Sequence, residues 1–544
     1  MSEIKTPGVY VEEVSKFPPS VAQVETAVPT FIGYTQTSPA ALVPKRITSL
    51  VEYETYFGGA NKEKIVLHDT VDGLTLEKPD ATFLMYYSLQ MYFANGGGPC
   101  YIVSVGNYPT TPINTTWKTS ALSAWESVEE STLVVFPDAV NLEEVDFYAL
   151  YQDAISKAET LKNRFVILDT YKGNLNVDAV TQTTTIEDIR DNVPSSIQAA
   201  AYFPHLKTAL NYTFNEDANI EHTGLQTTAS QPFFVDEKNQ LTVLQSQISS
   251  ATGAAVVADL LEQVIAIVDE INLTADGHVS TTDVVADFNQ ASAVNGTINA
   301  SVNTHITALI SAVNSAKDEK GAADGVSLNS IKTTNSNLYN QIKKLIGALN
   351  VVLPPSSSIA GVYAKTDGTK GVWKAPANVG LNYVVAPTEK ISDEEQEDLN
   401  IDTTAGKSVN AIRTFSGKGT LVWGARTFDS NDNEWRYISV RRLFDMIEKS
   451  VQNATERFVF EVNDASTWVK VKAMIENYLN QLWMSGALAG SKPEQAYQVR
   501  VGIPDGTMVD TDVNEGRMNI EVAIAAVRPA EFIVLRFSHK LQEA

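Results

Sequence analysis

The chain has 544 residues, of which 44% are hydrophobic and 19% are charged. This length predicts about three or four domains, and this composition excludes a disordered chain. The formal net charge of -24 argues against nucleic acid as a partner, because binding to phosphates requires clustered Lys and Arg. Cys100 is the single cysteine, so we expect neither an intramolecular disulfide nor a cysteine-based metal site.

The charge is unevenly distributed along the chain. Residues 211–350 carry 15 acidic and 6 basic side chains, a local net charge of -9, with no Arg. Residues 407–500 carry 13 basic and 10 acidic side chains, a local net charge of +3. This asymmetry predicts that one part of the chain faces solvent while another faces an acidic partner, and ordinary solvated faces are the alternative.

The first segment is predicted to be an isolated strand. Thr6-Pro-Gly-Val-Tyr-Val-Glu-Glu-Val14 follows a Pro-Gly break, and Pro18 and Pro19 separate it from the rest of the chain. A strand without a neighbour must join a sheet elsewhere, in its own chain or in another copy. The chain starts without a basic and apolar leader, and no stretch approaches the ~18 apolar residues that span a bilayer. We therefore expect synthesis and folding in the cytoplasm.

Residues 26–210 alternate between short apolar strands and helical segments. This alternation predicts a mainly parallel sheet with helices on both faces. The expected strands are Thr30–Tyr34, Gly96–Val105, Leu133–Pro137, Phe165–Asp169 and Ala199–Pro204, and the expected helices are Ala81–Phe93, Asp146–Leu161 and Thr185–Asn192.

Residues 211–350 differ in composition, because Ser, Thr, Asn and Ala dominate. Three long amphipathic stretches are predicted here, Leu241–Leu273, Asp283–Ala316 and Leu328–Leu349, and they indicate a helical-bundle insertion.

The C-terminal part begins with an irregular segment, residues 351–420, which is rich in Pro, Gly and turn residues. From Glu434 the pattern predicts an α+β region. Its expected helices are Trp435–Thr455 and Ser466–Leu482, and its expected strands are Phe458–Glu461, Tyr497–Val501, Met518–Val527 and Glu531–Phe537.

Motifs that carry chemistry are missing from the sequence. The six histidines are scattered, with no H-E-x-x-H and no pair at metal-ligand spacing. Gly406-Lys-Ser408 resembles the end of a phosphate-binding loop, but Ile401 stands where the partner glycine is required. No G-x-S-x-G segment presents a serine nucleophile. The sequence therefore predicts no catalytic, cofactor-binding or metal-binding residues, and a hydrolase built on the middle α/β region is the disfavoured alternative.

Nine segments stand out by their order and spacing. They are Thr6–Val14, Gly96–Val105, Ala199–Pro204, Ser358–Ala364, Gly371–Asn378, Asn410–Arg413, Trp423–Thr427, Tyr437–Arg442 and Pro529–Ile533. Taken together, they resemble the contractile tail sheath proteins of phages and of phage-like contractile injection systems. The resemblance implies a non-enzymatic subunit that polymerises as stacked hexameric rings around an inner tube, and contraction of such a sheath drives the tube through a target envelope. A surface decoration or adhesin module of the same kind of particle is the alternative.

The resemblance also implies a multidomain α/β and α+β fold. The inner sheath domain would consist of the C-terminal part together with the N-terminal arm, and the outer α/β domain would be subtilisin-like without being a protease. The implied regions are an arm strand at 1–25, an N-terminal α/β region at 26–110, the outer domain at 111–210 with 351–400, the exposed helical insertion at 211–350, the tube-facing domain at 401–528, and a C-terminal arm strand and tail at 529–544.

Two sets of site residues follow from this resemblance. The arm strands would add to the sheets of neighbouring subunits, although pairing inside their own subunit is the alternative. The excess of basic residues would attach the sheath to an acidic tube surface, with salt bridges between subunits or simple solvation as alternatives. The arm residues are Val9, Tyr10, Val11, Phe532, Ile533, Val534, Leu535, Arg536 and Phe537, and the basic residues are Arg436, Arg441, Arg442, Lys449, Lys470 and Lys472.

The implied partners are other sheath subunits, the inner tube protein, and the baseplate and terminal cap proteins. Neither nucleic acid nor direct membrane insertion is expected. The resemblance implies synthesis in a bacterial cytoplasm and incorporation into a phage tail or phage-like particle, released by lysis. A phage tail, an extracellular injection system and a membrane-anchored secretion system stay open, and Phe532–Lys540 looks closest to the phage-like injection systems.

Overall fold

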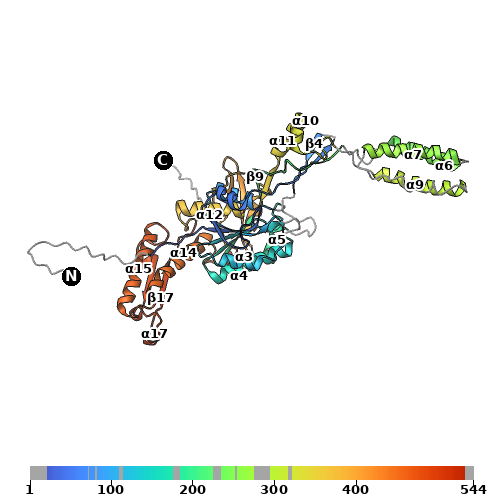
Figure 1. Cartoon of the computed structure of the whole chain (residues 1–544). Coiled ribbons are helices and arrows are strands. Elements are labelled where there is room, and N and C mark those ends of the chain that lie inside the picture. Colours follow the sequence, from blue (N-terminus) through green and yellow to red (C-terminus); the bar gives the residue numbers. More distant parts are fainter. Residues whose placement is uncertain are drawn as a thin grey trace, which may run out of the picture. The chain divides into compact units, whose positions relative to one another are not determined.

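Figure 1 shows the computed structural model of the chain, which describes residues 21–70, 73–79, 83–108, 114–174, 184–224, 235–251, 254–274, 295–315, 321–402 and 404–532. The predicted arm residues Val9–Val11 and Ile533–Phe537 lie outside these ranges. The chain divides into two compact units, each with its own core. Unit 1 comprises residues 1–61, 82–210 and 351–544, and unit 2 comprises residues 62–81 and 211–350.

Unit 1 is built on a nine-stranded sheet with the order β12-β15-β14-β8-β7-β6-β1-β5-β2. The strands from β14 to β5 pair in parallel, and β15, β12 and β2 add antiparallel strands at the two edges. The predicted, mainly parallel sheet is therefore confirmed. The strands are β1 (Pro29–Thr35), β2 (Lys45–Ile47), β5 (Cys100–Asn107), β6 (Leu133–Val135), β7 (Phe165–Leu168), β8 (Ala199–Phe203), β12 (Val379–Gly380), β14 (Val409–Phe415) and β15 (Gly419–Val422).

Side chains alternate between the two faces of this sheet, and both faces are covered. Val166 and Leu168 of β7 belong to one hydrophobic core, while Phe165 and Ile167 belong to the other. This explains why the strand is apolar throughout instead of alternating with polar residues. Helices α3 (Lys118–Glu126), α4 (Glu144–Leu161) and α5 (Thr185–Asn192) cover the first face, and α1 (Leu50–Phe57), α2 (Met85–Ala94) and α12 (Ser356–Lys370) cover the second.

Helix α12 lies in a segment that the sequence predicts to be irregular, so this prediction was wrong. The helix contains three consecutive serines from Ser356, and also Gly361 and Gly368. An added Cβ at Gly361 would come within 2.5 Å of the Tyr92 carbonyl oxygen of α2. Small residues thus allow α12 and α2 to pack closely, and this packing stabilises a helix whose own composition favours it poorly.

The predicted boundaries at residues 110 and 400 are not boundaries between sheets. β1 and β5 come from the predicted 26–110 region, yet β1 pairs with β6 of the next region. β14 comes from the predicted tube-facing domain, yet it pairs in parallel with β8. These are non-local pairings, and the sequence pattern shows strands without showing which strands pair.

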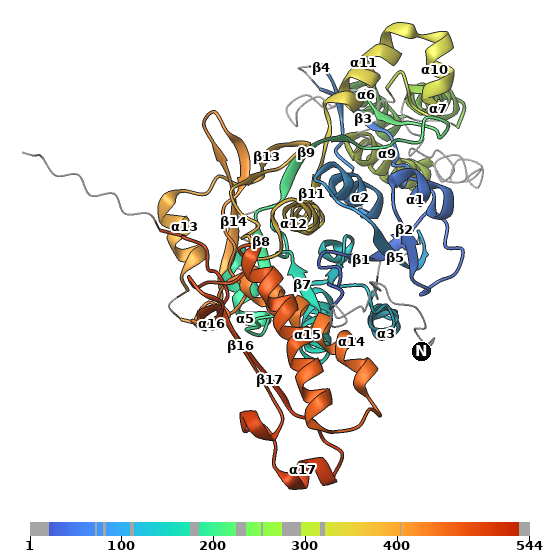
Figure 2. The same ribbon diagram turned by 90° about the vertical axis from the view of Figure 1, so that its left-hand side faces the viewer.

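A smaller α+β region follows the sheet in unit 1. Its long helices are α14 (Ile438–Thr455) and α15 (Ala465–Met484), which pack with the antiparallel strands β16 (Tyr497–Val501) and β17 (Ile520–Ile524) (Figure 2). Ile438 lies in the core of the large sheet, whereas Leu443 and Ile447 lie in the core of this region. Helix α14 therefore connects the two cores.

Most predicted elements of this region are confirmed, with two exceptions. The predicted strand Phe458–Glu461 is instead a 3-10 turn, Glu456–Phe458, followed by a loop. Glu531 and Phe532 lie outside any strand. The remaining elements of unit 1 are β9 (Leu206–Asn211), β11 (Asn350–Leu353) and β13 (Val384–Pro387) in one small sheet, with α13 (Asp393–Asn400), α16 (Pro493–Ala496) and α17 (Asp510–Asn514).

Unit 2 contains both helices and a small sheet. Its three-stranded sheet has the order β10-β3-β4, and residues 62–81 therefore belong with the predicted insertion. The predicted helix Leu241–Leu273 is interrupted, and its residues fall in α6 and α7. The elements are β3 (Val66–Thr70), β4 (Gly73–Leu76), β10 (Glu221–Thr223), α6 (Val235–Ser250), α7 (Ala254–Thr274), α9 (Asn295–Ser315), α10 (Leu328–Thr334) and α11 (Ser336–Ala348).

A buried carboxylate ties the large sheet to helix α2. Asp138 follows β6 and accepts hydrogen bonds from the backbone N–H groups of Tyr34 (2.8 Å) in β1 and Leu84 (2.6 Å) before α2. An added Cβ at Gly33 would lie 2.5 Å from this carboxylate, so the position requires glycine. Burial raises the pKa of Asp138 to about 7, although the backbone donors lower it.

Asp138→Asn should reduce the dependence of stability on pH. Because the pKa of Asp138 is raised in the folded state, the folded protein holds a proton that the unfolded chain releases, and stability falls as pH rises from about 4 to 7. The variant should lose about 1–3 kcal/mol less free energy of unfolding than the wild type between pH 5 and pH 8. Denaturant unfolding at both pH values measures this difference. Asp153→Asn, at the partly exposed surface of α4, serves as control, and an unchanged slope in Asp138→Asn would contradict the assignment.

Candidate functional site

Within the described ranges, no group of three or more His, Cys, Asp or Glu side chains is placed to hold a metal ion. None of the described helices is long and apolar enough to cross a membrane. Cys100 is buried, and burial raises the pKa of its thiol above the usual range. Within unit 1, polar side chains converge at two places. One is the contact of the N-terminal segment with the rest of the unit, and the other is the contact of the C-terminal segment.

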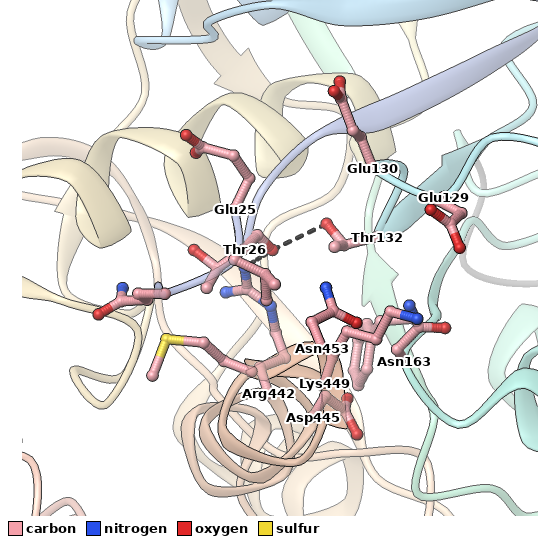
Figure 3. Close-up of a pocket in the computed structure, with 14 residues that line it drawn as sticks. Glu25, Thr26, Glu129, Glu130, Thr132, Asn163, Arg442, Asp445, Lys449 and Asn453 are labelled. Atoms are coloured by element: carbon pink, nitrogen blue, oxygen red, sulfur yellow. Dashed lines mark hydrogen bonds between the residues drawn. The ribbon is translucent and has the colours of Figure 1, made fainter. Parts of the chain in front are cut away.

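The N-terminal segment enters between α14 and the large sheet. Val21 is packed in the core of the C-terminal region, and the Val24 N–H donates to Ser450 Oγ of α14 at 3.1 Å. Thr132, just before β6, donates its hydroxyl to the Thr26 carbonyl oxygen at 2.8 Å and accepts from the Val28 N–H at 3.1 Å (Figure 3). Residues 21–28 are thus held from both sides.

A buried arginine joins this segment to two helices. The Arg442 guanidinium of α14 donates to both carboxylate oxygens of Asp367 in α12, at 3.2 and 2.5 Å. It also donates to the Thr26 carbonyl oxygen at 2.8 Å, and the Thr26 hydroxyl donates to Asp367 at 2.6 Å. The Arg442 guanidinium lies over the Tyr363 ring, 4.6 Å from its centroid. We call Thr26, Tyr363, Asp367 and Arg442 the Arg442 cluster.

The neighbouring arginine is also engaged inside the subunit. Arg441 donates to Asp445 Oδ1 from Nε at 2.9 Å and from Nη2 at 2.6 Å, and the same oxygen accepts from Gln198 Nε2 at 3.2 Å. Burial raises the pKa of Asp445 to about 7, while Arg441 lowers it. Gln198 directly precedes β8, so this contact attaches α14 to the large sheet.

The C-terminal segment returns to the large sheet at Glu531. Arg426, which follows β15, donates to Glu531 from Nε at 3.0 Å and from Nη2 at 2.7 Å. Asn400 Nδ2 (3.0 Å) and the Tyr437 hydroxyl (3.2 Å) also donate to this carboxylate. Burial alone would raise the pKa of Glu531, but these donors outweigh it and lower the pKa below the usual range. Glu531 is thus held as a carboxylate.

A cavity of about 300 Å³ lies beside the Arg442 cluster. Figure 3 shows it between the N-terminal segment, helix α14 and the turns at 129–132 and 163, with Lys449, Asn163 and Asn453 among its lining residues. The structure brings Lys449 to this cavity, and the side chain is half-buried.

The predicted basic surface is only partly present. The prediction was wrong for Arg441 and Arg442, which are 6% and 4% exposed and are paired inside the subunit. Arg436 donates to the Ser430 carbonyl oxygen at 3.1 Å, and Lys472 pairs with Asp505 at 2.8 Å. Lys470 is exposed.

Sequence reasoning missed the ion pairs Arg426–Glu531 and Arg442–Asp367, although three of these four residues lie in segments that it singled out. Arg426 lies in Trp423–Thr427 and Glu531 lies in Pro529–Ile533. The partners are 105 residues apart, and Arg442 and Asp367 are 75 residues apart. A single sequence gives the charges of such residues but not their pairing.

The described part of the chain has cores and buried anchors for both terminal segments, and it presents no cluster of metal-ligating side chains.

Comparisons with known proteins show similarity to tail sheath proteins. Residues 430–540 match the family described as the phage tail sheath C-terminal domain. The tail sheath protein of Vibrio phage KVP40 is 23% identical over 185 residues, which is 34% of this chain and 26% of that protein. The match thus spans about a quarter of the length of this curated relative.

Solved structures match over the whole chain. A chain of the anti-feeding prophage helical sheath in its contracted state is 28% identical, with a TM-score of 0.56 and coverage of 99% of this chain and 100% of that chain. A chain of the PVC sheath complex, an extracellular contractile injection system in its contracted state, is 25% identical, with a TM-score of 0.56 and coverage of 99% of both chains. The chain is thus similar to contractile tail sheath proteins, at residues 430–540 to their C-terminal domain and over 99% of its length to chains of solved sheath complexes.

Removing one partner of the Arg442 cluster should destabilise unit 1 strongly. Arg442→Met leaves Asp367 buried without its cation, and Asp367→Asn leaves Arg442 without its anion. Each variant should lose about 3–5 kcal/mol of unfolding free energy, measured by denaturant unfolding at pH 7. The double variant should lose less than the sum of the two. Arg457→Met, at an exposed position just after α14, is the control, and equal losses in all three single variants would contradict the role of the cluster.

Proposed function

We propose that the chain is the structural subunit of a contractile sheath, within a phage tail or phage-like particle. Copies would polymerise as stacked hexameric rings around an inner tube, and contraction would drive the tube through a target envelope. The observation that carries this proposal is the likeness over 99% of the chain to sheath chains in contracted complexes. Baseplate and terminal cap proteins are its further proposed partners.

The two anchored terminal segments suit this function. Arm strands at Val9–Val11 and Phe532–Phe537 would pair with sheets of neighbouring copies, because main-chain hydrogen bonds at a sheet edge need no matching side chains. Val21–Val28 and Glu531 would then transmit the position of a neighbour to the body of the subunit. Each added hydrogen bond contributes only about 0.5–1.5 kcal/mol, so cohesion would come from many copies.

Fewer basic residues are available for the proposed tube contact than the sequence predicts. Lys470 is exposed, and Arg436, Lys449 and Lys472 are half-buried, so these four stay available as candidates. Exposed ion pairs are individually weak, so such an attachment could hold an extended sheath and still be released on contraction. Residues 111–210 and 351–400, predicted as the outer, subtilisin-like domain, share the large sheet with the segments on either side, and they are proposed as the part of unit 1 that faces away from the tube.

Electron microscopy of the chain, produced together with its tube and baseplate proteins, tests the proposal. We expect helical sheaths, and a monodisperse monomer under these conditions would overturn it. Deleting residues 1–20 should abolish sheaths while leaving the melting temperature of the monomer unchanged, because the anchor from Val21 onward is retained. Sheaths of normal length from this variant would contradict the role of the N-terminal arm.

The helical part of unit 2 should be dispensable for polymerisation. The Gly321 N–H donates to the His222 carbonyl oxygen at 2.8 Å, so the chain enters and leaves this part at neighbouring positions. Replacing residues 225–319 with a short Gly-Ser linker should therefore preserve the sheet β10-β3-β4. We expect sheaths of normal length by electron microscopy. Loss of all polymerisation in a variant with a normal melting temperature would assign the helices to assembly instead of surface decoration.

A further inference from the structure

The loop between α14 and α15 carries three apolar side chains in solvent. Val459 is 60% exposed, Phe460 is 103% exposed, and Val462 is 69% exposed. Single exposed apolar residues are common on soluble proteins, but three within four residues form a patch. We call residues 459–462 the apolar loop.

Hydrogen bonds hold the apolar loop and the residue that follows it. The Val459 N–H donates to the Glu456 carbonyl oxygen at 3.1 Å, and the Glu461 N–H donates to the Phe458 carbonyl oxygen at 3.1 Å. At the end of the loop, Asn463 accepts from Trp468 Nε1 at 2.7 Å and donates to the Arg517 carbonyl oxygen at 2.9 Å. These hydrogen bonds restrict the loop, and a restricted loop loses less conformational entropy on binding.

Phe460 also has an unfavourable backbone conformation. Its φ is +70°, in the left-handed region that glycine adopts readily and bulky residues avoid. Inside the subunit the exposed ring gains little from packing that would compensate for this conformation. A strained residue whose side chain is exposed is a candidate for a contact outside the subunit.

We propose that the apolar loop docks on an apolar surface of a second copy of this chain. This inference rests on the proposed function, because it places the second copy in the same sheath. The loop lies within residues 430–540, which match the tail sheath C-terminal domain. A contact in this shared part fits a partner that sheath proteins have in common.

Charge argues against the proposed acidic tube as the occupant. The segment 458–463 contains one charged residue, Glu461, and no basic residue. It therefore does not complement an acidic surface, and the side chains that it offers for binding are the apolar ones of Val459, Phe460 and Val462. A second copy would bind through these side chains against the like-charge repulsion between two chains of net charge -24.

The size of the patch also favours a partner within a polymer. One aromatic side chain buries about 150–250 Å² when covered, so the whole loop remains well below the roughly 1,200 Å² of a stable complex. The contact is too small to hold two free subunits together. It contributes where several contacts join the same neighbours, as in a helical array of identical copies.

Photo-crosslinking in assembled sheaths tests this proposal. Phe460→p-benzoylphenylalanine, assembled from a mixture of ¹⁴N- and ¹⁵N-labelled chains, should yield mixed-isotope crosslinked peptides that both derive from this chain. Crosslinks to the tube or another particle protein, crosslinks within single copies only, or no crosslinks in intact sheaths would each overturn it.

Substitutions at Phe460 separate docking from folding. Phe460→Gly relieves the left-handed conformation, so the melting temperature of the monomer should be equal or higher, while the critical concentration for sheath assembly rises about tenfold. Phe460→Leu should retain assembly near the wild-type value. Val145→Ser, at another exposed apolar position, is the control. If the wild-type chain forms no sheath, the proposed function fails. If sheaths form equally well with Phe460→Gly, only the docking proposal fails.

Discussion

The buried contact between Arg442 and Asp367 is the constraint on which unit 1 depends. Three parts of the chain meet there: the N-terminal segment through Thr26, helix α12 through Asp367, and helix α14 through Arg442. None of these parts belongs to the large sheet, yet each is packed on it or beside it. Separating any one of the three parts would leave a buried charge without its partner, which is costly. Helix α14 gains a second attachment through Asp445 and Gln198, which fixes its direction relative to the sheet.

The sequence predicted the elements of the sheet better than their arrangement. Strands such as Phe165–Leu168 are short apolar runs, and the structure has them where their pattern places them. Long helices such as Ile438–Thr455 also follow from their periodicity. Helix Ser356–Lys370 was not predictable in this way, because its serines and glycines serve close packing against α2. The extent of the large sheet depends on pairings such as β14 with β8, which no local pattern encodes.

Local sequence also fails to show which charged residues pair with one another. The sequence shows the positive charges of Arg441 and Arg442, from which a surface position was expected. Both arginines are instead buried, because Asp445 and Asp367 pair with them inside the subunit. Lys470, in contrast, is exposed. Local composition therefore locates an excess of charge, while burial decides which of these charges another molecule can reach. The apolar loop is the opposite case, since Val459-Phe-Glu-Val462 alternates like a strand and instead projects into solvent.

The ion pair between Arg426 and Glu531 has a mechanical consequence for the C-terminal region. β17 ends at Ile524 and pairs with β16 in a two-stranded sheet, and residues 525–527 add a few backbone hydrogen bonds to Ala487, Ala489 and Ala496, so tension on the chain after Val527 would load these few bonds. Glu531 lies between β17 and the end of the chain, and it is bound by Arg426 beside the large sheet. A force applied beyond Phe532 therefore reaches the nine-stranded sheet first. The ion pair between Arg426 and Glu531 bears that load before the hydrogen bonds between β16 and β17 do.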